Sequence, residues 1–138
     1  MKLDPHAVGN AGLYFACYQL SLLGWNAMPT TRNARGIDVL AYSRDGKRFL
    51  GLQVKSLSKR ATVPIGTSLE KLMGDFWIIV NRVTTDPTAF ILRPREVKRL
   101  AHRAAKDGHV SFWLQANAYE RHNYREAWSR IGRGDEAT

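Results

Sequence analysis

Three polar residues in two strand-like segments are the best candidates for a chemical site. Asp38 lies in the first segment, and Gln53 and Lys55 flank Val54 in the second. Because side chains alternate between the two faces of a strand, Gln53 and Lys55 are predicted to share one face. Asp45-Gly46 between the segments is typical of a hairpin turn, which would bring Asp38 opposite Gln53. The sequence therefore predicts a carboxylate, an amide and an ammonium group on one patch of sheet.

This combination of groups suits metal-assisted cleavage of phosphodiester bonds. Mg²⁺, or Mn²⁺ in its place, prefers hard oxygen ligands and usually keeps several water molecules. Asp38 would supply an anionic oxygen, and the Gln53 amide and the backbone carbonyl of Val54 would supply neutral ones. Lys55 would orient the attacking water or offset charge on the phosphate in the transition state. We therefore predict Asp38, Gln53 and Lys55 as catalytic residues, and Asp38, Gln53 and Val54 as metal ligands.

The surrounding pattern predicts the elements that position these residues. Leu13, Ala16, Cys17 and Leu20 have the spacing of a buried helical stripe, and Gly24 follows as a stop signal. We expect helices at 8–23, 94–106 and 124–131, a helical turn at 68–73, loops at 56–67 and 85–87, and strands at 37–42, 48–55, 76–83, 88–93 and 110–114. Residues 25–35 are predicted as a short strand or loop. The fold class is therefore α/β, with a central sheet flanked by helices.

Length and charge limit the type of protein. The 138 residues suit one domain, predicted at 1–131, with a flexible tail at 132–138. There are 21 Lys and Arg against 12 Asp and Glu, a net charge of +9, which favours DNA as a partner. No segment is apolar enough to suggest a signal peptide or a membrane span. The single cysteine, Cys17, excludes a disulfide framework and favours the cytoplasm.

The motif resembles a known superfamily. Gly36-Ile37-Asp38 followed by Leu52-Gln53-Val54-Lys55-Ser56 is similar to the core of the PD-(D/E)XK nucleases, which include Holliday-junction resolvases and restriction endonucleases. The Gln-x-Lys ending resembles the variant of Mrr-like members. Gly9-Asn10-Ala11-Gly12 resembles the start of the opening helix, so the likeness covers about residues 9–83. It implies a restriction-endonuclease-like fold, a central mixed β-sheet flanked by α-helices, and Mg²⁺-dependent DNA cleavage.

Two departures from that pattern leave an alternative open. Leu13 stands where many members have a metal-binding glutamate, and Gln53 is neutral where an acidic ligand is usual. These residues favour a nuclease fold that binds nucleic acid or a partner protein without cleaving. Glu70 or Asp75 could complete the metal site if the loop folds back, but a solvated residue and a turn residue are the simpler interpretations.

Basic and aromatic residues add further predictions. Arg32, Arg35, Lys59 and Arg60 flank the motif and would contact phosphates, or only solvent. The predicted helix 94–106 carries a basic face that would rest on a nucleic-acid backbone or be solvated. Trp77, Trp113 and Trp128 are predicted in the core. A homodimer is plausible, since cutting both strands of a duplex often uses two copies of such a site.

Overall fold

The computed structural model describes residues 2–31 and 36–136. Its central sheet has five strands in the order β1-β2-β3-β5-β6. The bounds are β1 Asn26–Pro29, β2 Val39–Tyr42, β3 Phe49–Ser56, β5 Phe76–Asn81 and β6 Thr88–Leu92. Within this sheet β3 and β5 run parallel, and the other neighbouring pairs are antiparallel. The predicted central mixed sheet is therefore confirmed.

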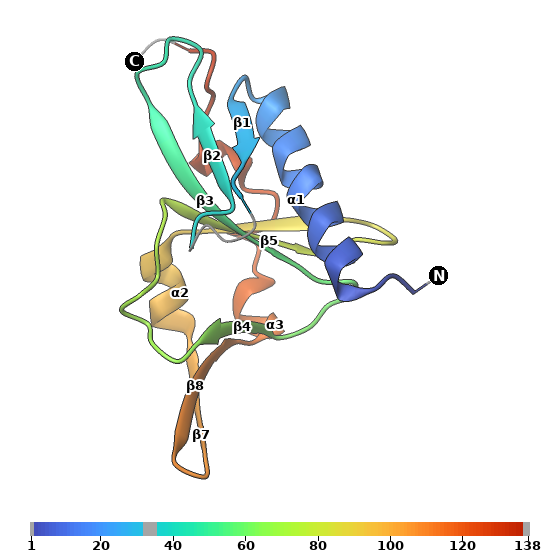
Figure 1. The fold of residues 1–138 in the computed structure, drawn as a ribbon, viewed down its shortest axis with the longest axis vertical. Coiled ribbons are helices and arrows are strands. Elements are labelled where there is room, and N and C mark those ends of the chain that lie inside the picture. The colour runs from blue at the N-terminus through green and yellow to red at the C-terminus, as the bar shows by residue number, and fades with distance from the viewer. Residues whose placement is uncertain (1, 32–35, 137–138) are drawn as a thin grey trace.

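The helix α1, Pro5–Leu22, covers one face of this sheet (Figure 1). Asp4 caps its start by accepting a hydrogen bond from the Ala7 N–H at 2.8 Å. Proline at the first helical position has no N–H to lose there. The predicted stripe is confirmed, since Ala16 and Leu20 are fully buried against the sheet. The helix begins three residues before the predicted start, because Asp4 serves as its N-cap and Pro5 as its first residue.

A second, smaller sheet packs on the opposite face of the central sheet. Its order is β4-β8-β7, with bounds β4 Val63–Gly66, β7 His102–Lys106 and β8 His109–Leu114. The remaining elements are α2 Pro94–Leu100, α3 Ala116–Tyr119 and the 3₁₀ helix η1 Trp128–Arg130. Val63 and Leu114 join Trp77 and Ile79 of β5 in a core cluster distinct from the one beneath α1.

Several predicted elements are wrong. The predicted helix 94–106 ends at Leu100, and the chain then continues as β7. The loop 56–67 contains β4, the segment 68–73 forms turns without a helix, and 124–131 contains only η1. Ala101 is extended, with ψ of 136°, and this breaks the helical run. The alanines of the following segment, His102–Lys106, favour a helix in isolation. Its pairing with β8 is a tertiary contact, and this contact overrides the local propensity.

Residues 132–136 of the predicted flexible tail form hydrogen bonds with distant parts of the chain. The Gly132 carbonyl accepts a hydrogen bond from the Trp25 indole at 2.9 Å. The Gly134 N–H donates to the Leu23 carbonyl at 2.9 Å, and its carbonyl accepts from the Arg44 N–H at 2.8 Å. The chain thus returns to the end of α1 and to the β2–β3 turn. Residues 137 and 138 of the predicted tail lie outside the described residues.

Candidate active site

Asp38 lies where β2 separates from β3. Val39 pairs with Leu52, so residues 53–56 of β3 extend past the end of β2. The Asp38 N–H donates to the Leu52 carbonyl at 2.8 Å, and its carbonyl accepts from the Thr30 N–H at 2.9 Å. Its side-chain Oδ2 accepts a hydrogen bond from the Val54 N–H at 2.8 Å. Three backbone-directed contacts therefore fix this carboxylate at the fork between the strands.

A cleft of about 460 Å³ opens beside Asp38, between α1 and the free edge of β3. Its lining residues are Pro5, His6, Gly9, Asn10, Leu13, Tyr14, Pro29, Thr30, Thr31, Asp38, Val54 and Ser56. The N–H and C=O of one residue point to the same side of a strand, so the Val54 carbonyl faces this side together with its N–H. The carboxylate and the carbonyl proposed as metal ligands therefore meet at one cleft.

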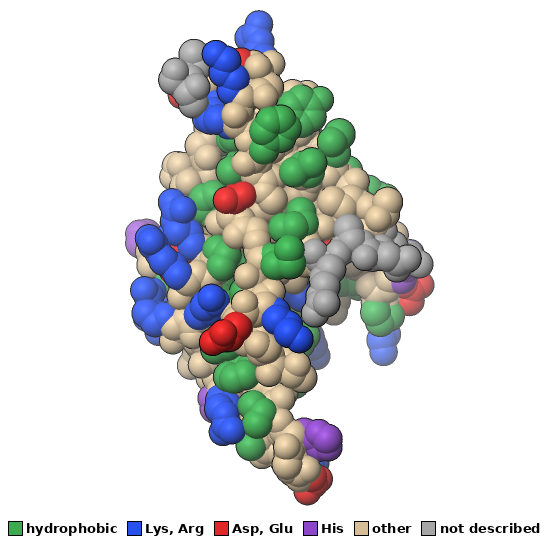
Figure 2. Space-filling view, turned by 60° about the vertical axis from the view of Figure 1, so that its left-hand side comes forward, with side chains coloured by type: hydrophobic (Ala, Val, Ile, Leu, Met, Phe, Trp, Pro, Cys, Tyr) green, Lys and Arg blue, Asp and Glu red, His purple; other side chains and the backbone are tan. Residues whose placement is uncertain are grey.

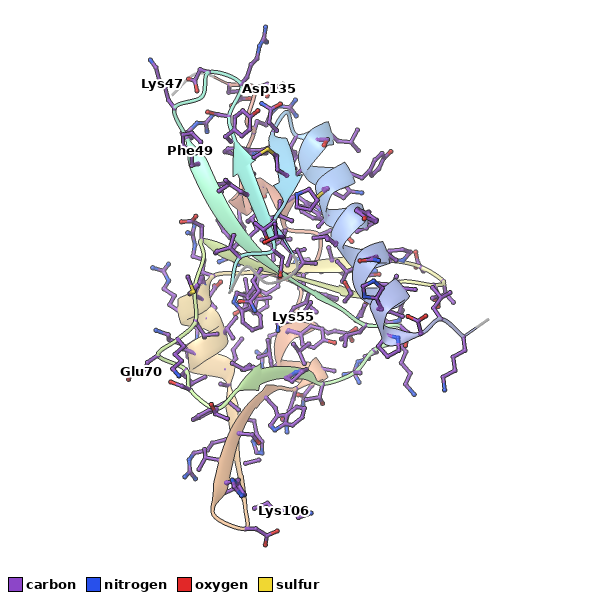
Figure 3. The ribbon with its side chains drawn as sticks, viewed as in Figure 1. Lys47, Phe49, Lys55, Glu70, Lys106 and Asp135 are labelled. Carbon is purple, nitrogen blue, oxygen red and sulfur yellow. The ribbon has the colours of Figure 1, made fainter. Side chains whose placement is uncertain are left out.

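Lys55 is the second chemical group of the site. Its side chain is partly buried, and Nζ lies 5.3 Å from the centre of the Trp77 ring. Burial lowers the pKa of the ammonium below its ordinary value, and the negative charge of Asp38 partly opposes this by raising it. Lys55 (labelled in Figure 3) thus lies over an aromatic face, and its ammonium is within electrostatic range of the Asp38 carboxylate.

Gln53 has different surroundings. It lines a separate hollow of about 280 Å³, together with Gly36 and with residues 65–68 and 71–73. On β3 it alternates with Val54, whose side chain packs in the cluster beneath α1. Asp38 and Gln53 therefore line different hollows, and a shared role in metal binding stays a prediction.

The oxygen atoms near Asp38 suit Mg²⁺, but with the smallest number of carboxylates that usually holds this ion. The ion is commonly held by one or two carboxylates together with water and substrate phosphates. Asp38 and the Val54 carbonyl provide two hard oxygens at the cleft. Across the described residues, 2–31 and 36–136, no three His, Cys, Asp or Glu side chains gather into a metal site. Leu13 lines the cleft where a glutamate would add charge.

The other predicted site residues are distributed around this core. Asp75 accepts a hydrogen bond from the Gly51 N–H at 2.8 Å, which agrees with its interpretation as a turn residue. Glu70 is exposed (labelled in Figure 3). Lys59 is exposed, whereas Arg60 forms an ion pair with Glu120 at 2.5 Å. Arg32 and Arg35 lie outside the described residues.

Sequence reasoning missed two features of the site. Gly12 lets α1 approach β3, since a Cβ there would lie 1.7 Å from Ser56 Oγ. Glu120 binds Arg82 at 3.0 Å as well as Arg60, and it also accepts a hydrogen bond from Asn81. A glycine on the buried side of a helix was a usable signal for the first feature. The second joins residues 38 to 60 positions apart and has no local signal.

Comparison with solved structures identifies the fold. The Holliday junction resolvase Hjc of the archaeal hyperthermophile Archaeoglobus fulgidus matches with a TM-score of 0.52 and 13% identity, over 80% of this chain and 86% of that chain. This chain has the restriction-endonuclease-like fold. The predicted restriction-endonuclease-like fold is therefore confirmed. No protein-family model matches the chain, and no curated protein sequence matches it. No helix among the described residues could cross a membrane.

Proposed function

We propose that this chain is a metal-dependent endonuclease that hydrolyses phosphodiester bonds in DNA. The observation that supports this best is Asp38, fixed at the fork between β2 and β3 beside an open cleft, together with Lys55 on β3, whose ammonium interacts electrostatically with that carboxylate. Two opposite charges in a partly buried site interact more strongly than on an open surface. The fold is shared with a Holliday junction resolvase, and the net charge of +9 favours a polyanionic substrate.

In this mechanism each residue has one role. Asp38 and the Val54 carbonyl would hold Mg²⁺ or Mn²⁺, with the Gln53 amide as a further oxygen. The bound ion supplies Lewis-acid chemistry and a more acidic water. Lys55 donates from its ammonium to the phosphate, where negative charge increases in the transition state. Its contact with the Trp77 ring and its electrostatic attraction to Asp38 would orient it before the substrate arrives, so little reorganisation would be needed.

The second candidate is a non-catalytic module that binds nucleic acid through the same fold. Leu13 and Gln53 support it, because both are neutral at positions where the resemblance implies acidic ligands. One carboxylate attracts a divalent cation less strongly than two or three. Under this alternative, the cleft beside Asp38 would bind DNA without breaking it.

Asp38→Asn and Lys55→Ala distinguish the two candidates. For a nuclease, both variants lose cleavage of duplex or branched DNA in Mg²⁺ or Mn²⁺ and keep nearly all of their DNA affinity. Glu70→Gln is the matched control, since it removes an exposed carboxylate from a nearby loop and should cut normally. Mn²⁺ binding followed by electron paramagnetic resonance gives a second measurement, in which Asp38→Asn alone among these variants loses the ion. A parent protein that neither cuts DNA nor binds Mn²⁺ contradicts the enzyme and supports the binding module.

The proposal extends to assembly and location. A homodimer would present two copies of the Asp38 site to the two strands of a duplex. The cytoplasm suits both a DNA substrate and a lone cysteine, Cys17. Sedimentation at micromolar concentration, with and without duplex DNA, tests the assembly, and a monomer under both conditions would contradict it.

A further inference from the structure

The outer part of the β7–β8 hairpin is a two-stranded ribbon. β4 pairs with β8 at Phe112, Trp113 and Leu114 and reaches no further toward the tip. Residues 104–111 therefore project without a third strand, as Figure 1 shows at the lower end of the molecule. Asp107 and Gly108 at the tip have φ of 52° and 79°, which suits the tight turn of a twisted hairpin. An isolated two-stranded hairpin is only marginally stable in water, so a binding partner would stabilise it.

One face of this ribbon combines an aromatic ring with basic and small side chains. The register places His102 opposite Trp113 and Lys106 opposite His109, with Ala104 and Ser111 between them. The neighbouring Leu114 is buried in the core, so the Trp113 face points away from the core. Trp113 is 37% exposed, and its indole N–H donates to Ser111 Oγ at 2.8 Å.

Positive charge continues from α2 onto the ribbon. Arg95 and Lys98 are exposed on α2, and Arg103 and Lys106 are exposed on β7. None of these four cations forms an ion pair with another residue of the described parts of the chain. Figure 2 shows Lys and Arg side chains extending toward the narrow lower end of the molecule, where a histidine is also visible. Asp107 at the tip is the acidic residue of the hairpin.

We propose that this hairpin inserts into the major groove of duplex DNA, an inference that rests on the proposed function. The groove is about 12 Å wide and 8.5 Å deep, and it admits a two-stranded ribbon. The three residues of β7 beyond the reach of β4, 104–106, span about 10 Å at 3.4 Å per residue, which exceeds that depth. Arg103 and Lys106 then contact the phosphates beside the groove, while Asp107 at the tip accepts from base amino groups.

The same geometry disfavours double-stranded RNA. The major groove of an A-form helix is deep and narrow, and side chains cannot read it. A ribbon that only gathered phosphates would bind both duplexes alike, because both carry the same backbone charge. Preference for DNA that depends on the ribbon is therefore the signature of groove insertion.

Two matched pairs of substitutions test the ribbon. Arg103→Gln/Lys106→Gln removes two charges beside the Asp107-Gly108 turn. Arg44→Gln/Lys47→Gln removes two beside the Asp45-Gly46 turn, at the opposite end of the molecule (Lys47 and Lys106 in Figure 3). All four side chains are of the same two types, and both turns have the Asp-Gly sequence. Circular dichroism and thermal melting confirm that both variants fold.

Binding is measured by fluorescence anisotropy with a labelled 20-base-pair duplex and a chelator, so that cleavage does not interfere. We expect the Arg103/Lys106 variant to lose at least tenfold in affinity at 0.1 M salt, since each phosphate contact contributes close to a factor of eight there. The slope of log affinity against log salt should become shallower by about 2, and the Arg44/Lys47 variant should keep the parent slope. Equal losses of DNA affinity in both variants would overturn the proposal that the β7–β8 hairpin binds DNA.

Methylation by dimethyl sulfate then identifies the groove, because guanine N7 lies in the major groove and adenine N3 in the minor one. The parent should protect guanine N7, and Trp113→Ala should reduce that protection. Protection of adenine N3 alone, or equal ribbon-dependent affinity for duplex RNA, overturns groove insertion. If the Arg103→Gln/Lys106→Gln variant binds DNA like the parent while the parent still cuts, DNA binding by the hairpin is refuted and the nuclease proposal stays intact. Ribbon-dependent binding without cleavage refutes the nuclease and leaves the ribbon.

Discussion

Gly12 determines how closely α1 approaches β3, and substituting it gives a prediction with a built-in control. A Cβ at Gly12 would lie 1.7 Å from Ser56 Oγ and 2.5 Å from Ser56 Cβ, whereas a Cβ at Gly9 meets nothing within 4 Å. Gly9→Ala should therefore stabilise the protein by about 0.5–1 kcal/mol through helix propensity alone. Gly12→Ala gains the same propensity term, but it overpacks the interface at a cost of about 1–3 kcal/mol.

Urea denaturation of the two alanine variants should thus give midpoint shifts of opposite sign. Ser56→Gly is expected to rescue Gly12→Ala, because the nearest remaining atom of residue 56 is then Cα at 3.4 Å. The double-mutant cycle should give a coupling free energy of about 1–2 kcal/mol. Equal stabilisation by Gly9→Ala and Gly12→Ala, or the absence of rescue, would show that α1 does not lie this close to β3.

Three other changes test the charged groups. Burial lowers the pKa of Lys55, so just below the ordinary value of 10.5 the unfolded chain binds more protons than the folded chain. The free energy of unfolding should therefore rise with pH in that range. Lys55→Met should lack this rise in urea titrations between about pH 7 and 10. Arg130→Met leaves Glu96 without two hydrogen bonds of 2.7 and 2.8 Å, and urea denaturation should show a loss of about 3 kcal/mol that Glu96→Gln partly restores. Gln53→Glu should raise Mn²⁺ affinity roughly tenfold or more, and unchanged affinity would show that residue 53 does not reach the ion.

The fork between β2 and β3 was predictable because its determinants are local. Alternation of polar and apolar residues set the faces of the strands, and Asp45-Gly46 set the turn. The observed register ends with Val39 opposite Leu52, and the Asp38 N–H donates to the Leu52 carbonyl, so the ladder does not continue in register to Asp38 and Gln53. The cleft beside Asp38 was not predictable, because it depends on α1 docking against Ser56, a contact between distant parts of the chain.

The Asp-Gly turn signal also occurs in the β7–β8 hairpin, where no hairpin was predicted from the sequence. The predicted helix 94–106 stops at Asp107-Gly108, although the same residue pair at Asp45-Gly46 predicts a hairpin turn. The alanines and basic residues before it favour a helix in isolation, and only pairing with β8 shows the strand. The error also affected Trp113, which was predicted in the core with Trp77 and Trp128. The latter two are buried, whereas Trp113 lies on the outer face of β8.

A single carboxylate and a positively charged surface have a common consequence for binding. Asp38 alone attracts a divalent cation weakly, because the attraction scales with the charge of the ligands. A phosphate oxygen at the cleft would add a second anionic ligand, as is usual for Mg²⁺ sites that include substrate. Metal affinity and DNA affinity are then thermodynamically coupled, and each must increase the other by the same factor. The neutral residues Leu13 and Gln53 leave less negative charge to repel the DNA backbone. Under the proposed function, metal binding at Asp38 would therefore depend on bound DNA, whereas a site with several carboxylates would depend on its own ligands.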